Sequence, residues 1–206
     1  GAFGGKDLVG KWGYKKSIVY GLLFSAIGAA AMIIAVNANT FTGGVLLHNG
    51  TLGVNNAQAL GTDTLTITQG TPGNILNLSN TSGADITHNN ILISINNNFR
   101  FVGTNNLNLG SGNVFLTADV SCAVLSNYTL TIEGVISGAY AFSKGNTGTL
   151  LLTGANTYTG ATSVNAGTLQ ITNSQGTGAT SGGVSVASGA TLALSGGIAV
   201  GNESLT

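Results

Sequence analysis

The stretch ANTYTGATSVNAGTLQI, residues 155–171, decides the fold because the chain contains it twice. Residues 38–54 read ANTFTGGVLLHNGTLGV, and the two stretches align without a gap over their whole length, with eight identities. A third, partial copy reads GGVSVASGATLAL over residues 182–194. Internal repetition of this kind indicates an array of stacked units that share one continuous core.

The spacing of Thr-Leu pairs gives the period of the array. Thr129, Thr149, Thr168 and Thr191 are each followed by Leu, so the pair recurs once in roughly every twenty positions. A chain of hairpins would return its strands about twice as often. Polar and apolar residues alternate after each of these threonines, which is typical of half-buried strands.

We therefore expect an all-β fold, a parallel β-solenoid in which equivalent residues of successive turns stack about 4.8 Å apart. Leu, Ile and Val point inward, and Gly and Asn occupy corners that need positive φ. The middle of the chain repeats less clearly, but five short apolar segments with Asn or Gly between them are predicted strands. They are residues 77–78, 92–95, 99–102, 107–109 and 114–116.

The composition agrees with such a fold and excludes some functions. The chain is 43% hydrophobic and only 6% charged, with 33 Gly and one Pro among 206 residues. Six basic and six acidic residues cancel, so no long-range field favours nucleic acid, which is not an expected partner. The single cysteine, Cys122, excludes an intramolecular disulfide, and we interpret it as a small buried hydrophobic residue.

Residues 1–38 form a separate N-terminal region. Residues 17–36, SIVYGLLFSAIGAAAMIIAV, carry no charge and follow Lys15 and Lys16. A basic region, an apolar region and small residues before Ala38 are the parts of an export signal, with cleavage predicted after Ala38. The length also fits a membrane-spanning anchor. Both alternatives predict a hydrophobic helix here, and residues 39–206 then form the solenoid.

Residues 136–171, ISGAYAFSKGNTGTLLLTGANTYTGATSVNAGTLQI, resemble the autotransporter-associated β-strand repeat, also called the passenger-associated transport repeat. The flanking segments look like turns of the same kind, so the resemblance covers most of residues 39–206. The matching motif residues that we single out are Gly148, Thr149, Leu150, Asn156, Tyr158, Gly160, Gly167, Thr168 and Leu169.

This resemblance implies a right-handed parallel β-helix that is exported and displayed at the bacterial surface. It also implies a C-terminal outer-membrane barrel in the full-length protein, and a role in adhesion or in assisting secretion of the passenger. It supplies no catalytic residues. The chain ends at Thr206 in mid-repeat, so we expect an incomplete passenger segment.

Residues that could perform chemistry are few. His48 aligns with Asn165 of the second copy and is expected at an exposed corner. Asp85 and His88 are three apart, so they should point to opposite faces of a strand and form no metal pair. Asp119 and Glu133 are closer in sequence than one period of the array, so we do not expect them to stack into a sugar-cleaving pair. No catalytic, cofactor or metal site is predicted.

Three functions remain as hypotheses. A non-enzymatic adhesive module would contact a host surface, glycans or sister chains. A secretion-assisting stalk would fold turn by turn outside the cell. The alternative is a carbohydrate-active β-helix, a polysaccharide lyase or hydrolase. The aromatic pair Phe41 and Tyr158, which occupies one position of the two copies, is interpreted as packing along the solenoid or as a sugar-stacking platform.

Overall fold

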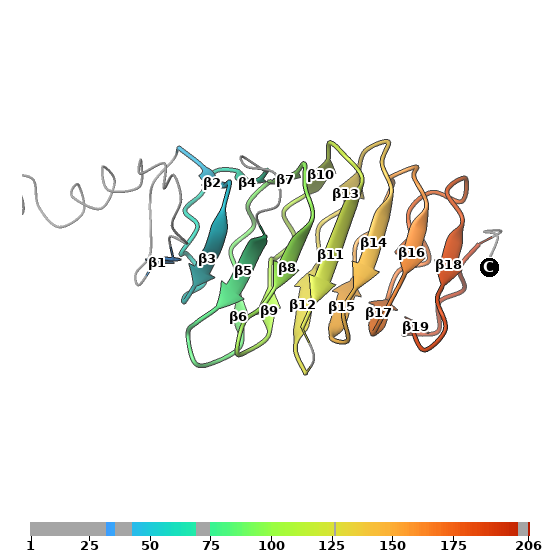
Figure 1. Ribbon diagram of the computed structural model, residues 1–206. Coiled ribbons are helices and arrows are strands. Elements are labelled where there is room, and N and C mark those ends of the chain that lie inside the picture. The colour runs from blue at the N-terminus through green and yellow to red at the C-terminus, as the bar shows by residue number, and fades with distance from the viewer. Residues whose placement is uncertain (1–31, 36–42, 69–74, 126, 202–205) are drawn as a thin grey trace, which may run out of the picture.

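The chain winds into a parallel β-solenoid with three sides (Figure 1). The structure is a computed structural model that describes residues 32–35, 43–68, 75–125, 127–201 and 206. In these residues, all the strand pairings are parallel. The predicted all-β parallel solenoid is therefore confirmed.

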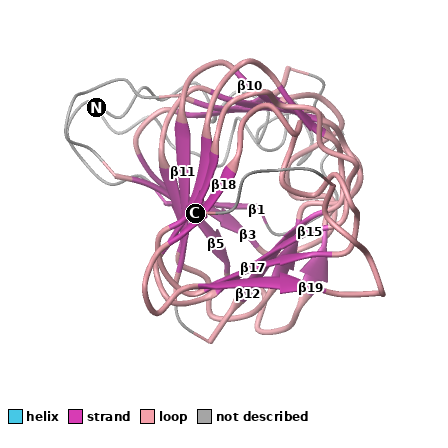
Figure 2. Cartoon of the chain, turned by 90° about the vertical axis from the view of Figure 1, so that its right-hand side faces the viewer, coloured by secondary structure: helices cyan, strands magenta, loops and turns pink. Residues whose placement is uncertain are grey.

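Three sheets form the sides, and Figure 2 shows them around the core. Sheet A contains β1 (Met32–Ala35), β3 (Gly50–Val54), β5 (Leu76–Asn80), β8 (Phe99–Phe101), β11 (Val120–Val124), β14 (Phe142–Gly145), β16 (Thr162–Val164) and β18 (Val184–Val186). Sheet B contains β2 (Val45–Leu47), β4 (Leu65–Ile67), β7 (Ile93–Ile95), β10 (Val114–Leu116) and β13 (Ile136–Ser137). Sheet C contains β6 (Ile86–Thr87), β9 (Leu107–Asn108), β12 (Thr129–Ile132), β15 (Thr149–Leu152), β17 (Thr168–Ile171) and β19 (Thr191–Leu194).

One turn visits the sheets in the order B, A, C, as β10, β11 and β12 show. The Thr-Leu ladder lies in sheet C with the register that the sequence predicts. Thr129 pairs with Thr149, Thr149 with Thr168, and Thr168 with Thr191, and the following leucines pair in the same way. Leucines one period apart in the sequence therefore lie on top of one another.

The core is a column of inward side chains from all three sheets. In the turn from Val114 to Ile132, every second strand residue is buried, while the residues between them face outward. Each buried Leu, Ile or Val stabilises the fold by about 1.5–3 kcal/mol relative to an exposed one. Because each turn covers the apolar row of its neighbour, stability comes from stacking.

The corner between sheets A and C shows why Asn and Gly recur. In four successive turns, the residue with positive φ just before the sheet C strand is Asn127, Asn146, Gly167 or Gly189. Asn and Gly tolerate this left-handed conformation better than other residues do. The predicted Gly and Asn corners are confirmed at these positions.

The predicted N-terminal helix is not supported. Of the apolar segment 17–36, the structure describes only Met32–Ala35, and these residues form strand β1. β1 pairs in parallel with Thr51–Val54 of β3 and extends sheet A by one strand. Ile33 and Ile34 are β-branched and favour a strand, and β3 supplies the edge with which this strand pairs. The rest of the predicted helix, and Ala38 with the predicted cleavage site, lie outside the described residues.

The two sequence copies lie on different sides of the solenoid. In the first copy, residues 45–47 are in sheet B and residues 50–54 are in sheet A. The aligned residues 162–164 and 168–171 of the second copy are in sheets A and C. The repeat therefore encodes a strand, a corner and a second strand, and it can begin on either of two sides.

Candidate functional site

Asn156 of the repeat motif joins three successive turns. Its side chain is buried, with Oδ1 accepting the Ile136 N–H at 2.8 Å and Nδ2 donating to the Gly176 carbonyl at 2.7 Å. Its own backbone N–H donates to the carbonyl of Gln175 at 3.1 Å. These groups lie on the side of the turn where sheet B has no further strand. One amide side chain therefore replaces some of the backbone hydrogen bonds that such a strand would make with its neighbours.

Tyr158 belongs to the same buried cluster. Thr162 Oγ1 donates to the Thr177 carbonyl at 2.7 Å, so the Tyr158 hydroxyl donates to Thr162 Oγ1 at 2.6 Å. The Tyr158 ring is fully buried and packs against Phe142, with ring centroids 5.9 Å apart. A buried ring cannot stack on a sugar, so Tyr158 packs along the solenoid. Its sequence partner, Phe41, lies outside the described residues.

The motif glycines lie where neighbouring turns approach closely. A Cβ at Gly160 would collide with the backbone of Tyr140 and Ala141, and one at Gly148 would collide with the Leu125 carbonyl. Gly167 needs its positive φ of 65°. The remaining motif residues are strand residues of the ladder, namely Thr149, Leu150, Thr168 and Leu169. In the described turns, the motif residues thus allow neighbouring turns to pack and pair, and they present no reacting group.

A second feature of the repeat becomes visible only in the structure. Each copy continues beyond its last strand into a loop of the form N-x-Q-x-x-G, residues 56–61 and 173–178. The Asn side chain accepts the Gln N–H in both loops, at 2.8 Å from Asn56 and 3.0 Å from Asn173. Both loops end on a glycine with positive φ. Extending the two-copy alignment to residues 61 and 178 would have found this loop.

Lys144 is the most unexpected buried group. It points inward from β14, is 1% exposed, and donates from Nζ to the carbonyls of Gly145 (2.7 Å), Asn146 (2.6 Å) and Ala166 (3.1 Å). These carbonyls belong to the sheet A–C corner of two turns. Burial lowers the pKa of Lys144 to about 8. The ammonium group thus joins the A–C corners of two neighbouring turns by hydrogen bonds made inside the solenoid.

Cys122 is in register with Lys144 in sheet A and is also buried. Burial raises the pKa of its thiol to about 12, although Lys144 acts in the opposite direction. The interpretation of Cys122 as a small buried residue therefore agrees with the structure.

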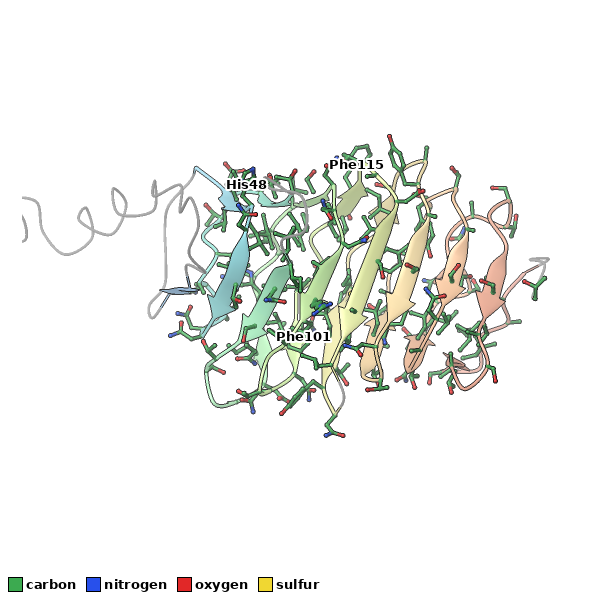
Figure 3. All side chains as sticks on the ribbon, viewed as in Figure 1. His48, Phe101 and Phe115 are labelled. Atoms are coloured by element: carbon green, nitrogen blue, oxygen red, sulfur yellow. The ribbon has the colours of Figure 1, made fainter. Side chains whose placement is uncertain are left out.

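The two histidines have different surroundings. His48 follows β2 and is exposed (Figure 3). His88 is buried, with Nε2 accepting the Leu60 N–H at 3.1 Å and Nδ1 donating to the Asn89 carbonyl at 2.6 Å. Burial lowers the pKa of His88, while the hydrogen bond to Asn89 raises it. Asp85 is exposed and binds Asn106 instead, so the prediction that Asp85 and His88 diverge agrees with the structure.

The acidic residues are spread over different corners. Asp119 lies between β10 and β11, where it accepts the Ala141 N–H at 2.8 Å. Glu133 follows β12 and accepts from Asn108 Nδ2 at 2.7 Å. These two carboxylates leave sheets at different sides of the coil, so they do not form the pair that sugar cleavage requires. Within the described ranges, no group of three His, Cys, Asp or Glu side chains could hold a metal ion.

Two outer surfaces remain as candidates for contact with a partner. On sheet C, a shallow depression is lined by residues of β6, β9 and β12 and of their flanking corners. Three of its polar side chains already have partners within the protein, since Asn106 donates to Asp85 and Asn108 accepts from the Gly110 N–H. On sheet B, Phe115 is 55% exposed, and Leu92 and Leu46 are similarly exposed. Figure 3 shows Phe115 on the outer surface at β10.

Comparison with known proteins identifies the repeat. The family model described as the passenger-associated-transport-repeat matches residues 27–54 and 142–171. These two segments of the chain are similar to passenger-associated transport repeats. The second match spans β14 to β17 and contains all the motif residues named above, and the first includes β1, β2 and β3.

The chain is also similar to the adhesin BmaC autotransporter of Brucella suis biovar 1 (strain 1330), with 43% identity over 63 residues. The match covers 31% of this chain and 2% of the relative, so the chain spans a small part of that protein's length. No solved structure matches the chain. Among the described segments, there is no helix of sufficient length and apolarity to span a membrane.

Proposed function

We propose that the chain is a passenger segment of an autotransporter, a non-enzymatic protein of the bacterial surface that acts in adhesion, in assisting secretion, or in both. The observation that carries this proposal is the repeat match over residues 142–171, which coincides with four consecutive solenoid strands. The similarity to an autotransporter adhesin supports the same assignment. The expected partners are a host surface, glycans or sister chains.

Stacking of turns supports a role in secretion. Each turn uses the exposed edge of the preceding one as its template, so folding can proceed one turn at a time as the chain emerges. We propose a right-handed coil, since crossover connections between parallel strands have this hand in most proteins. A C-terminal outer-membrane barrel of the full-length protein would serve as the exit.

The export signal is a separate proposal. Cleavage after Ala38 would remove β1, which pairs with β3 in the solenoid. N-terminal sequencing of protein extracted from the cell surface distinguishes the two arrangements. A chain beginning at Asn39 supports the signal, whereas a chain that retains Met32–Ala35 supports β1 as a permanent part of sheet A.

The experiment that tests the proposed function compares bacteria displaying the full-length protein with bacteria displaying the same protein without residues 43–201. An epitope placed outside residues 43–201, and therefore retained in both strains, reports surface display. We expect the epitope to be accessible to antibody on intact cells, and host-cell attachment to fall when the segment is deleted. An epitope reachable only after lysis would contradict surface display, and unchanged attachment with intact display would contradict adhesion.

A further inference from the structure

The outer face of sheet B carries one aromatic ring with a serine in the register position on each side of it. Phe115 lies between Val114 and Leu116, which point into the core, so its ring points outward (Figure 3). The strand register places Ser94 on one side of it and Ser137 on the other. With strands about 4.8 Å apart, both serines lie beside the ring.

Two polar groups next to this ring have unused hydrogen-bonding capacity among the described residues. The Ser94 hydroxyl and the Asn113 side-chain amide form no hydrogen bond with the described part of the chain. By contrast, Ser137 Oγ donates to the Val114 carbonyl at 3.3 Å, and the Thr117 hydroxyl accepts from Asn96 at 3.0 Å. The ring is therefore flanked by one hydroxyl and one amide that can each donate and accept.

The same face excludes several kinds of partner. The outward column of sheet B reads Leu46, Thr66, Ser94, Phe115 and Ser137, without a charged residue. An anionic or cationic ligand would have no counterion in this column. A stable protein interface needs a buried area of about 800 Å² per partner, much more than one ring with polar neighbours supplies.

We propose that Phe115, Ser94 and Asn113 form a binding site for a neutral pyranose unit of a glycan. A pyranose has one face of C–H groups, which packs against the negative face of an aromatic ring, and its hydroxyls extend sideways toward hydrogen-bonding groups. The inference deepens the proposed adhesive function and rests on it, since it names the class of surface molecule that this segment binds.

The test is a titration of the isotope-labelled full chain with methyl β-D-galactopyranoside and methyl β-D-glucopyranoside, followed by NMR. We expect saturable shifts confined to Ser94, Asn113, Phe115 and Ser137. One stacked ring with two hydrogen bonds predicts a dissociation constant of about millimolar order. The F115A variant should bind at least about fivefold more weakly, while F115W should retain binding.

The matched control is L46A, because Leu46 is similarly exposed in the same outward column and lacks an aromatic ring. Its affinity should equal that of the wild type. S94A and N113A, which leave the exposed ring in place, should each weaken binding about threefold. An unchanged thermal midpoint verifies that every variant is folded.

Three results would overturn the inference: no shifts with either glycoside, equal binding by F115A and the wild type, or equal losses in L46A and F115A. A change of oligomeric state in F115A without sugar binding would also overturn it, because the face would then contact a second copy. If the chain binds neither glycoside but deletion of residues 43–201 still abolishes host attachment, the glycan site is refuted and the proposed adhesive function is retained.

Discussion

At Asn156, a single side chain satisfies a backbone donor of the preceding turn and a backbone acceptor of the following one. Both groups are buried in a region where no sheet B strand follows β13. Unsatisfied buried donors and acceptors each cost about 1–3 kcal/mol. The physical reason for Asn at this motif position is therefore hydrogen bonding between turns, and not contact with a ligand.

The N156A substitution is expected to lower the free energy of unfolding by about 3 kcal/mol, since it leaves the Ile136 N–H and the Gly176 carbonyl without partners. Urea unfolding followed by circular dichroism measures the change. The control is N165A at an exposed corner, which should stay within about 0.5 kcal/mol of the wild type. Equal effects of the two substitutions would show that Asn156 has no special role.

His88 predicts a pH dependence of stability. Its Nε2 accepts a backbone N–H, so the protonated ring would place two donors against each other. Burial lowers the folded-state pKa below the ordinary value of 6.5, so the unfolded chain binds the proton more readily. Stability should therefore be highest above pH 6.5 and fall as the pH decreases below it, by at most about 1.4 kcal/mol per pH unit.

Urea unfolding at several pH values from neutral to mildly acidic tests this expectation. The H88Q variant can still accept from Leu60 and donate to Asn89 but does not titrate, so its stability should vary little over this range. The H48Q variant changes the exposed histidine and should keep the wild-type dependence. A dependence that persists fully in H88Q would mean that other groups cause it.

Some single-residue features could be predicted and others could not. The exposed position of His48 follows from its alignment with Asn165. Lys144 did not follow from residue type, since a lysine is usually placed at the surface. The alternation of β14 puts Phe142 inward and hence Lys144 inward as well, but the three carbonyls that bind its ammonium group come from corners that only the structure brings together.

At the scale of elements, strand β15 gives a direct test of register. Its sequence, Thr-Leu-Leu-Leu, does not by itself distinguish the inward face from the outward one. The ladder does, because Leu150 pairs with the buried Leu130 and Leu169, while Leu151 pairs with Thr131 and Gln170.

The L150A substitution should lower the free energy of unfolding by about 2–5 kcal/mol, because it leaves a cavity in the core. The matched L151A substitution removes the same atoms from the outer face and should cost less than about 1 kcal/mol. Chemical denaturation of both variants measures the difference. If L151A proved the more damaging of the two, the register of sheet C would be shifted by one residue.

The existence and period of most strands could be predicted from the sequence, but the side on which each copy lies could not. The repeated frame contains two strands and one corner, and nothing in it marks the sheet in which it begins. Turn length also varies, since the turn that carries Leu52 onto Leu78 is longer than the turn that carries Leu150 onto Leu169. Among the described residues, each N-x-Q-x-x-G loop occupies a side of its turn that lacks a strand.

The whole molecule is an array held together by contacts between neighbouring turns. Its candidate binding surface is correspondingly local, since Phe115 lies on one turn and its flanking serines on the two adjacent turns. That site could not be predicted from Val114-Phe115-Leu116 alone, where three apolar residues hide the alternation. The register with Ile93-Ser94-Ile95 shows which residue faces outward.

The central claim is that successive turns stack in parallel, and distances along one outward column test it most directly. Thr87, Asn108, Thr131, Leu151, Gln170 and Ala193 form such a column in sheet C. Spin labels can be attached in pairs at Thr87 and Gln170 and at Thr87 and Ala193, in a chain whose Cys122 is replaced by Ala. The backbone separations of the two pairs are about 19 Å and about 24 Å, so the distance between spin labels that pulsed electron paramagnetic resonance measures should increase by about 4.8 Å with the additional turn. A separation that fails to increase with the additional turn would contradict the parallel solenoid.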